Sequence, residues 1–281
     1  MTFNNQITKC TVCQKQAHFY KKLTEVTLYY CDFCKHRFTD LNSIKVKESY
    51  SDEYFKDRHK NYFENQNLKL FNYIYKAIES NKSSSCSVLD VCCGQGDLLK
   101  YLREKTNSIK LTGIDYHQNK SEKDIKFLCG DIFNTKFNEK YDVIINLASI
   151  EHVWNVQDYT LLLKNLSKDG GIIISNTIND SSIVYMAARI IYKFGFKTPM
   201  ERLYDKHHLN HFSNKSLEYL HKKNSLNIIE KPYIGWPMNA IDLPENNLLM
   251  KIIYKLSLYV LFICEKISGK GILQTILAKK I

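Results

Sequence analysis

The sequence lacks the segments that direct a chain out of the cell or across a membrane. Its N-terminal residues contain no basic stretch followed by an apolar core and a small-residue cleavage site, so we predict no secretory signal. The most apolar stretch, residues 248–264, is interrupted by Lys251 and Lys255, and its unbroken runs are well below the ~18 residues that a spanning helix needs. We therefore expect a cytoplasmic protein in which this stretch forms a buried or surface-docked amphipathic helix. The alternative is peripheral contact of this helix with the inner face of the membrane.

Other protein classes are disfavoured by what is missing or scarce. The sequence has no internal repeat, no low-complexity segment and no Gly-x-Ser-x-Gly motif of a serine hydrolase. The net charge is +11, but the sequence contains no dense Lys/Arg run. This favours solubility over a nucleic-acid partner as the reason for the charge. The nine cysteines are odd in number and make a poor disulfide framework. With 44% hydrophobic residues in 281, the chain has enough apolar material for a packed core.

Four of the cysteines form a metal-binding pattern near the N-terminus. Two Cys-x-x-Cys pairs, separated by seventeen residues, predict a closed tetrahedral zinc site with a structural role, made by Cys10, Cys13, Cys31 and Cys34. The short aromatic and β-branched stretches around them predict hairpin strands. We therefore predict a zinc ribbon over residues 1–45, followed by a polar and aromatic connector over residues 46–62.

Residues 63–281 are predicted to form an α/β domain, because apolar runs of strand type alternate with stretches of helical periodicity. This alternation indicates a Rossmann-like, mostly parallel sheet of seven strands with helices on both faces. The predicted strands are 87–92, 110–115, 125–131, 141–148, 172–178, 226–236 and 271–281. The predicted helices are 63–80, 96–105, 157–168 and 213–224, with helical inserts at about 181–196 and 246–267.

The stretch SVLDVCCGQGDLLKYL, residues 87–102, indicates a ligand site at the end of the first strand. Small residues at Cys92, Gly94 and Gly96 form a turn that lets a ligand approach the backbone closely. Asp115 ends the next predicted strand, where a carboxylate can accept both hydroxyls of a ribose, and Asp131 ends the third. A nicotinamide-dinucleotide site is disfavoured, because Leu99 stands where that fingerprint requires a third small residue.

The motifs VLDVCCGQGDLL, GIDYH, FLCGDIF and YDVIINLASIEHV, in this order and spacing, resemble the class I S-adenosylmethionine (AdoMet)-dependent methyltransferases. The resemblance implies that AdoMet is the cofactor. It also implies that residues of this chain contact the methionine end, the ribose and the adenine of AdoMet, and that others form the wall of the pocket. By this likeness the binding residues would be Asp90, Cys92, Gly94, Gly96, Asp115, Tyr116, Asp131, Ile132, Asn146 and Leu147. Cys92 departs from the family pattern, which has glycine there, so the methionine end would fit slightly differently.

Methyl transfer to a hydroxyl is helped by a general base, and histidine suits that task near neutral pH. His152 follows the fourth predicted strand, where the family commonly carries Glu-His-Val. His208 and His211 lie in a His-rich segment that looks like that of related small-molecule and glycan methyltransferases. The alternative for these histidines is ordinary packing or loop ordering, with Ser213 as a helix N-cap.

The order of zinc ribbon, connector and methyltransferase resembles a bacterial or archaeal group often assigned to surface-glycan, lipid or secondary-metabolite methylation. We therefore predict methyl transfer to a hydroxyl of a sugar, glycan or other small metabolite. Two alternatives stay open: an RNA methyltransferase with the ribbon as reader, and a non-catalytic scaffold of the same fold. The RNA alternative is disfavoured because Cys34 replaces the histidine ligand of that class. In addition, residues 146–149 lack an Asn-Pro-Pro-Tyr-type motif.

Overall fold

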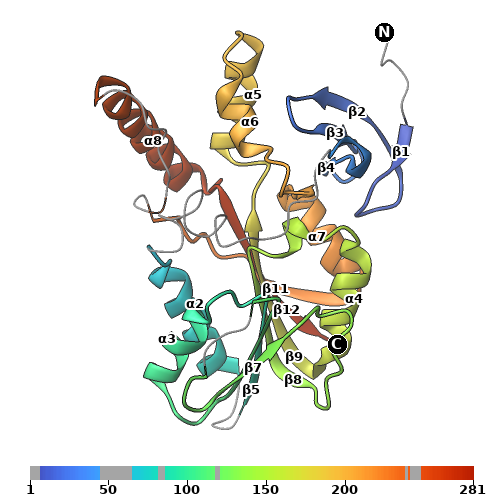
Figure 1. Cartoon of the computed structure of the whole chain (residues 1–281), viewed down its shortest axis with the longest axis vertical. Helices are drawn as coiled ribbons and strands as arrows, with labels where there is room; N and C mark the ends of the chain where they lie inside the picture. Colours follow the sequence, from blue (N-terminus) through green and yellow to red (C-terminus); the bar gives the residue numbers. More distant parts are fainter. Residues whose placement is uncertain (1–6, 45–64, 82–85, 118–120, 238–239, 241–247) are drawn as a thin grey trace.

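The computed structural model of the chain describes residues 7–44, 65–81, 86–117, 121–237, 240 and 248–281 (Figure 1). The predicted connector, residues 46–62, lies outside the described residues. The described parts form one seven-stranded sheet with helices on both sides and one smaller five-stranded sheet. The predicted α/β class and Rossmann-like sheet are therefore confirmed, whereas the proposed domain boundaries stay predictions.

The large sheet has the strand order β11-β12-β9-β8-β5-β6-β7. Neighbours from β9 to β7 pair in parallel, and β12 lies antiparallel between β9 and β11. The chain order reverses between β5 and β8, so the carboxyl ends of these two central strands flank the switch point where ligands bind in such sheets. The strands are β5 (Ser87–Val91), β6 (Lys110–Asp115), β7 (Ile125–Cys129), β8 (Tyr141–Leu147), β9 (Ser167–Ile178), β11 (Leu226–Glu230) and β12 (Leu273–Lys280).

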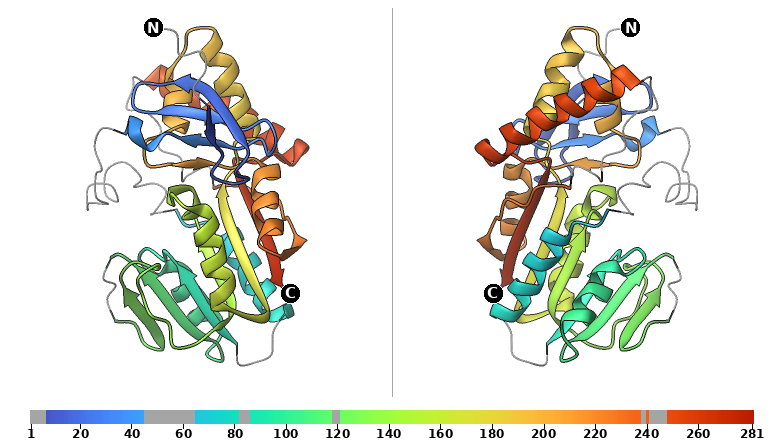
Figure 2. Two further views of the ribbon diagram at one scale, coloured as in Figure 1. Left: turned by 90° about the vertical axis from the view of Figure 1, so that its right-hand side faces the viewer. Right: turned by 90° about the vertical axis from the view of Figure 1, so that its left-hand side faces the viewer.

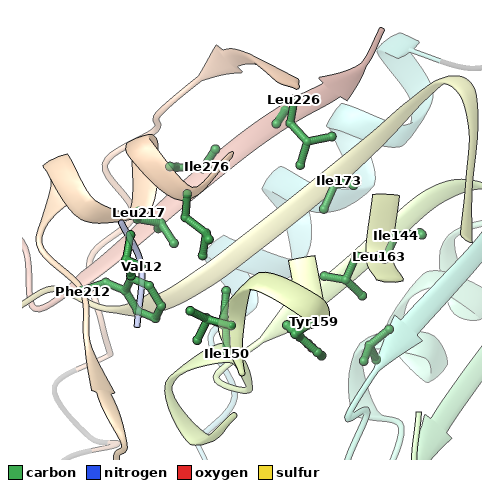
Figure 3. Close-up of a cluster of buried hydrophobic side chains, with 14 of the residues drawn as sticks. Val12, Ile144, Ile150, Tyr159, Leu163, Ile173, Phe212, Leu217, Leu226 and Ile276 are labelled. Atoms are coloured by element: carbon green, nitrogen blue, oxygen red, sulfur yellow. The ribbon is translucent and has the colours of Figure 1, made fainter. Parts of the chain in front are cut away.

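Helices cover both faces of this sheet because each has one apolar stripe. On one face α2 (Leu68–Asn81) and α3 (Asp97–Lys105) bury side chains such as Ile74 and Leu99. On the other face α4 (Val156–Leu166) and α7 (Asn214–Lys223) bury Leu163 and Leu217, which Figure 3 shows pointing toward the sheet. The hydroxyl of Ser213 accepts from the backbone N–H of Ser216 and so caps α7, as predicted.

Among the boundaries that differ from those predicted, three have a clear local reason. Strand β9 begins at Ser167 rather than 172, because a register shift against β8 lets it continue through Gly170, whose φ of 70° suits glycine. Strand β11 ends at Glu230 rather than 236, ahead of Pro232, which has no N–H for a sheet hydrogen bond. Strand β7 ends at Cys129, because Gly130 turns the chain with a φ of 150°.

The small sheet contains the four ribbon strands and one strand from the part of the chain that forms the large sheet. The ribbon strands are β1 (Ile7–Lys9), β2 (Gln16–Lys22), β3 (Thr27–Tyr30) and β4 (Arg37–Thr39). The two-residue strand β10 (Asn210–His211) pairs antiparallel with β4, which the sequence did not predict. Val12 of the ribbon and Phe212, which follows β10, belong to the same apolar cluster as α4 and α7 (Figure 3). The ribbon therefore packs as part of the core.

Helices α5 (Ile183–Lys193), α6 (Thr198–Leu203) and α8 (Leu248–Ser268) lie at the end of the molecule where β9 ends (Figures 1 and 2). The ribbon lies at the same end. The backbone of Asp180, just after β9, bonds to Phe212, and that of Ile183 bonds to Lys270, just after α8. Because β8 and β9 are parallel, the loop after β8 also opens at this end.

Candidate active site

The four ribbon cysteines come together as predicted. Their sulfur atoms all lie within 4.8 Å of one another, and Cys10 and Cys34 are 3.5 Å apart. These separations exceed the ~2.05 Å of a disulfide and suit a tetrahedral zinc–thiolate centre, in which sulfurs stand roughly 3.8 Å apart. The fit to a structural zinc ion is therefore good.

The two cysteine turns repeat one backbone pattern. The N–H of Gln14 bonds to the carbonyl of Cys10, and the N–H of Lys35 bonds to that of Cys31. Gln14 and Lys35 have φ values of 60° and 61°, a left-handed conformation that closes each turn. The same fold at both turns points the thiols inward, which prepares a closed four-sulfur site.

The glycine turn after β5 is tied to the end of β6. The carboxylate of Asp115 accepts hydrogen bonds from the N–H of Gly94, at 2.8 Å, and from that of His117, at 3.0 Å. Cys92 and Gly94 have φ values of 56° and 55°, so the cysteine in place of the usual glycine adopts a left-handed backbone. A Cβ added at Gly94 would meet no atom within 4 Å, which shows that this face of the turn is open to a ligand.

Gly96 is required at the same turn for a different reason. It precedes α3 with a φ of 76°, and an added Cβ would lie 2.7 Å from the ring of Phe127 in β7. The ring thus packs directly on the backbone where α3 begins, and only glycine leaves it that space. This contact fixes the first turn of α3 against β7.

Negative charge collects around the turn. Burial, followed by the charge of Asp115, raises the pKa of the Asp90 carboxyl to about 8. Burial, then the charges of Asp115, Asp90, Asp131 and Glu151, raises the pKa of the Cys92 thiol to about 12, although part of that side chain reaches solvent. A cationic ligand such as the sulfonium amino acid of AdoMet would relieve this repulsion, whereas a pyrophosphate would increase it.

The residues proposed for the adenine lie at the ends of β6 and β7. Tyr116 is 65% exposed at the rim. The carboxylate of Asp131 accepts from the N–H of Phe133, at 2.9 Å, and from the side-chain amide of Asn134, at 3.0 Å. Ile132 is buried in the core cluster. Asp131 therefore orders its own turn, and its role toward an adenine stays a prediction.

Asn146 and Leu147, proposed as the pocket wall, end β8. The side chain of Asn146 is fully buried and donates from Nδ2 to the hydroxyl of Ser175, at 2.9 Å, in β9. That hydroxyl lies 3.1 Å from Nε2 of His221. The partly buried side chain of Leu147 packs against the apolar cluster to which residues of α3 belong. The Nδ2 group of Asn146 thus connects β8 to β9 and, through Ser175, to helix α7.

His152 and His208 lie side by side, with ring centroids 4.9 Å apart. Nδ1 of His152 donates to the carbonyl of His207 at 2.7 Å, an assignment that makes Nε2 the proton-accepting nitrogen. Burial lowers the pKa of His152, which favours the neutral ring. The loop that carries Glu151 and His152 is a single 3-10 turn, Ile150–His152, held to the other loop by the N–H of Leu209, which donates to the carbonyl of Glu151.

Glu151 is a site residue that the sequence reasoning did not single out. It is buried, its carboxylate accepts from the hydroxyl of Thr177 at 2.7 Å, and burial raises its pKa to about 7. One ligand atom each from Glu151, His152 and His208 lies within 4.8 Å of the others, so the set could hold a divalent cation. The adjacent Glu-His pair after a strand was the available signal.

His211 adjoins His208, with ring centroids 6.3 Å apart, but it is buried more deeply. It is fully buried in β10, its ring packs on Tyr204 with centroids 4.7 Å apart, and Nε2 stands 3.5 Å from the hydroxyl of Thr39 in the ribbon. Burial lowers its pKa well below the usual value. This place favours packing between ribbon and core over contact with a substrate.

Comparison with known proteins identifies the family. A family model described as a methyltransferase domain matches residues 54–231, more than half of the chain. The chain therefore belongs to the methyltransferase domain family. The predicted resemblance to class I AdoMet-dependent methyltransferases is confirmed, and AdoMet is the cofactor that the family implies.

Individual relatives match over shorter stretches. The chain is similar to the ubiquinone biosynthesis O-methyltransferase of Rickettsia canadensis, with 34% identity over 43% of this chain and 56% of that protein. It is also similar to the malonyl-[acyl-carrier protein] O-methyltransferase of Acetivibrio thermocellus, with 28% identity over 43% of this chain and 47% of that protein. The chain thus spans about half the length of these curated relatives. The solved plantazolicin methyltransferase BpumL, in complex with a monoazolic desmethylPZN analog and SAH, shares the fold. Its TM-score is 0.52 at 19% identity, over 82% of this chain and 93% of that one.

Proposed function

We propose that this chain transfers a methyl group from AdoMet to a hydroxyl of a sugar, surface glycan or other small metabolite. The observation that carries the proposal is the shared edge of β5, β6 and β8. There, Cys92 of the open glycine turn lies within electrostatic reach of the buried Asp90 and of Glu151. Glu151 directly precedes His152 of the His152–His208 pair. The O-methyltransferase names of the two curated relatives support an oxygen atom as acceptor.

The residues at this edge suit the binding of AdoMet. Asp115 and the backbone of Gly94 would hold the ribose side, and Asp90 would face the cationic amino-acid end. Bound there, AdoMet would supply a methyl group activated by its sulfonium, whose S–C bond breaks as the O–C bond forms, the electron pair staying on sulfur. Ile132 and Leu147 contribute apolar surface that helps to exclude water.

His152 is the residue best arranged to take the hydroxyl proton. Its Nδ1–H is committed to the carbonyl of His207, so Nε2 carries the lone pair, and the lowered pKa keeps it neutral near pH 7. His208, packed against it, would orient the acceptor or share the proton. General-base help of this kind is worth about 10²–10⁴ in rate.

The test separates binding from chemistry. Calorimetric titration of Asp115→Ala with AdoMet should show strongly weakened binding. His152→Ala and His208→Ala should bind AdoMet normally and lower turnover by about 10²-fold or more with a hydroxyl acceptor. His211→Ala changes a residue that packs between ribbon and core, so it should mainly lower the stability of the fold.

Three results would change the proposal. Absence of AdoMet binding by the unmodified chain would favour the scaffold alternative. Salt-sensitive methylation of RNA would favour the reader alternative. Unchanged turnover in both histidine variants would remove the proposed base.

A further inference from the structure

Helix α8 carries a stripe of exposed apolar side chains. Leu256 and Ile267 are 62% and 81% exposed, and the exposed apolar residues recur at helical spacing: Ile252, Leu256, Tyr259, Val260, Ile263 and Ile267. Of the α8 side chains that the structure describes, Glu265 alone is buried. A helix of a globular protein places its apolar stripe against the core, whereas α8 carries an apolar stripe on its exposed side as well as half-buried apolar side chains such as Leu258 and Phe262.

Helix α5 and the turn that follows it show the same feature. Phe194 and Phe196 are 77% and 69% exposed, and Met186, Ile190 and Ile191 are exposed as well. Among the described residues, twenty-one large apolar side chains are exposed, and eleven belong to α8 and to residues 183–197. Helices α5 and α8 contact each other at the end of the molecule that also carries the ribbon (Figures 1 and 2). We name these eleven residues the α5/α8 surface.

The charges within these two segments have one sign. Residues 183–197 and 248–270 contain seven Lys and Arg residues and a single acid, Glu265, which is buried. The side chains of Lys193, Lys197, Lys255, Lys266 and Lys270 are exposed. An apolar surface rimmed by lysines is complementary to a lipid layer, whose anionic headgroups lie above an apolar interior. A second copy of the chain would instead bring like charges together.

We infer that the α5/α8 surface docks on an anionic lipid bilayer, with the two helices lying in the plane of the interface. No helix among the described residues is both long and apolar enough to cross a membrane. A helix that carries exposed lysines beside Leu, Ile and Tyr instead partitions into the headgroup region, with its apolar face buried about 5–10 Å deep. This inference concerns binding and stands apart from the proposed chemistry.

The test measures binding of the full chain to vesicles by sedimentation. The unmodified chain should bind vesicles of equal parts phosphatidylcholine and phosphatidylglycerol, and bind phosphatidylcholine vesicles about tenfold or more weakly. Added salt should weaken the binding, because the lysine contribution is screened. Leu256→Glu and Phe194→Glu should each lower the partition coefficient about tenfold or more, since each removes buried apolar area and adds a repelled charge.

Matched controls keep the result specific. Leu161→Glu changes an exposed leucine, 45% accessible, on α4 and should bind vesicles as the unmodified chain does. Lys255→Glu should weaken binding, whereas Lys223→Glu, exposed at the end of α7, should have little effect.

Two outcomes would overturn the inference. One is the absence of binding to anionic vesicles. The other is a dimer in analytical ultracentrifugation that Leu256→Glu dissociates while vesicles fail to compete for it, because the surface would then be covered by a second copy. AdoMet titration of the same samples reports separately on the proposed function.

Discussion

The side-chain amide of Asn210 joins the ring of His36 in the ribbon to the loop that follows His152. Its oxygen accepts from Nε2 of His36 at 3.1 Å and from the hydroxyl of Thr11 at 3.0 Å. Its nitrogen donates to the carbonyl of Val153 at 2.6 Å. Asn210 and His36 are fully buried, and burial lowers the pKa of His36 to about 3, so this ring is neutral. The ribbon and the loop that follows His152 are therefore one hydrogen-bonded unit.

Asn210→Ala should disturb both stability and turnover. The change leaves buried groups of His36 and Val153 without this partner, which costs about 1–3 kcal/mol for each unsatisfied group. Because the same amide holds the loop after His152, turnover should fall more than AdoMet affinity. Chemical denaturation, calorimetry and initial rates measure the three quantities. The exposed Asn227→Ala in β11 is the matched control. Unchanged turnover in the folded variant would contradict the coupling.

Removal of zinc should destabilise the whole chain. The four cysteines share one buried cluster with Tyr159 and Phe212 of the core, so the effect of zinc loss should not stay confined to the ribbon. Arg37 of the ribbon also forms an ion pair with the buried Asp180, beyond the end of β9. Cys31→Ser should therefore lower the temperature of a single unfolding transition in calorimetry. Cys264→Ser, at an exposed cysteine of α8, should not. Two separate transitions, with the core transition unmoved, would show that ribbon and core are independent.

The strand–helix alternation and the aspartates at strand ends could be predicted because they are local patterns. Strand β6 matches its predicted bounds, and the cap at Ser213 follows from a short side chain ahead of a periodic stretch. The cysteine spacing likewise predicted which four residues meet. Each of these features depends on neighbours in sequence or on one well-defined metal geometry.

The contacts between ribbon and core could not be predicted in this way. Strand β10 has two residues, too short for any periodicity, and it forms only because β4 offers an edge. Asn210 lies in a polar stretch, and nothing local distinguishes it from a surface residue. The outward-facing stripe of α8 also depends on where the rest of the chain lies, since periodicity alone predicts an apolar stripe and not its direction.

Gly113→Ala should destabilise the fold by about 1–3 kcal/mol through overpacking. Gly113 is in β6, and an added Cβ would stand 2.7 Å from the sulfur of Cys93 and from a methyl carbon of Leu99. Removing the sulfur should restore part of the loss, so Cys93→Ala/Gly113→Ala should be more stable than the sum of the single changes indicates. At Gly235, the added Cβ would be 3.6 Å from Tyr233, so Gly235→Ala is the control that should change little. Urea denaturation measures the stability of Cys93→Ala, Gly113→Ala, the double variant and Gly235→Ala. Purely additive effects of the first two changes would refute the contact.

Asp90 should make both stability and cofactor binding depend on pH. Burial, then the charge of Asp115, raises its pKa from an ordinary 3.8 to about 8 in the folded chain. Between these two values the folded chain holds a proton that the unfolded chain has released. The contribution of Asp90 to the free energy of unfolding is therefore largest below pH 4 and falls as pH rises toward 8, by at most about 6 kcal/mol.

Asp90→Asn should remove that fall and raise the stability of the cofactor-free chain near pH 7. The exposed Asp124→Asn should leave the pH profile of unfolding unchanged. For binding the sign is opposite, because a cationic amino-acid end prefers the carboxylate. AdoMet affinity should increase as pH rises from 6 to about 8, and binding below pH 8 should release a proton. Calorimetry in buffers of different ionisation enthalpy measures that proton directly. Release that persists in Asp90→Asn would assign the proton to another group, and a pH-independent affinity would place the cationic end of the cofactor away from Asp90.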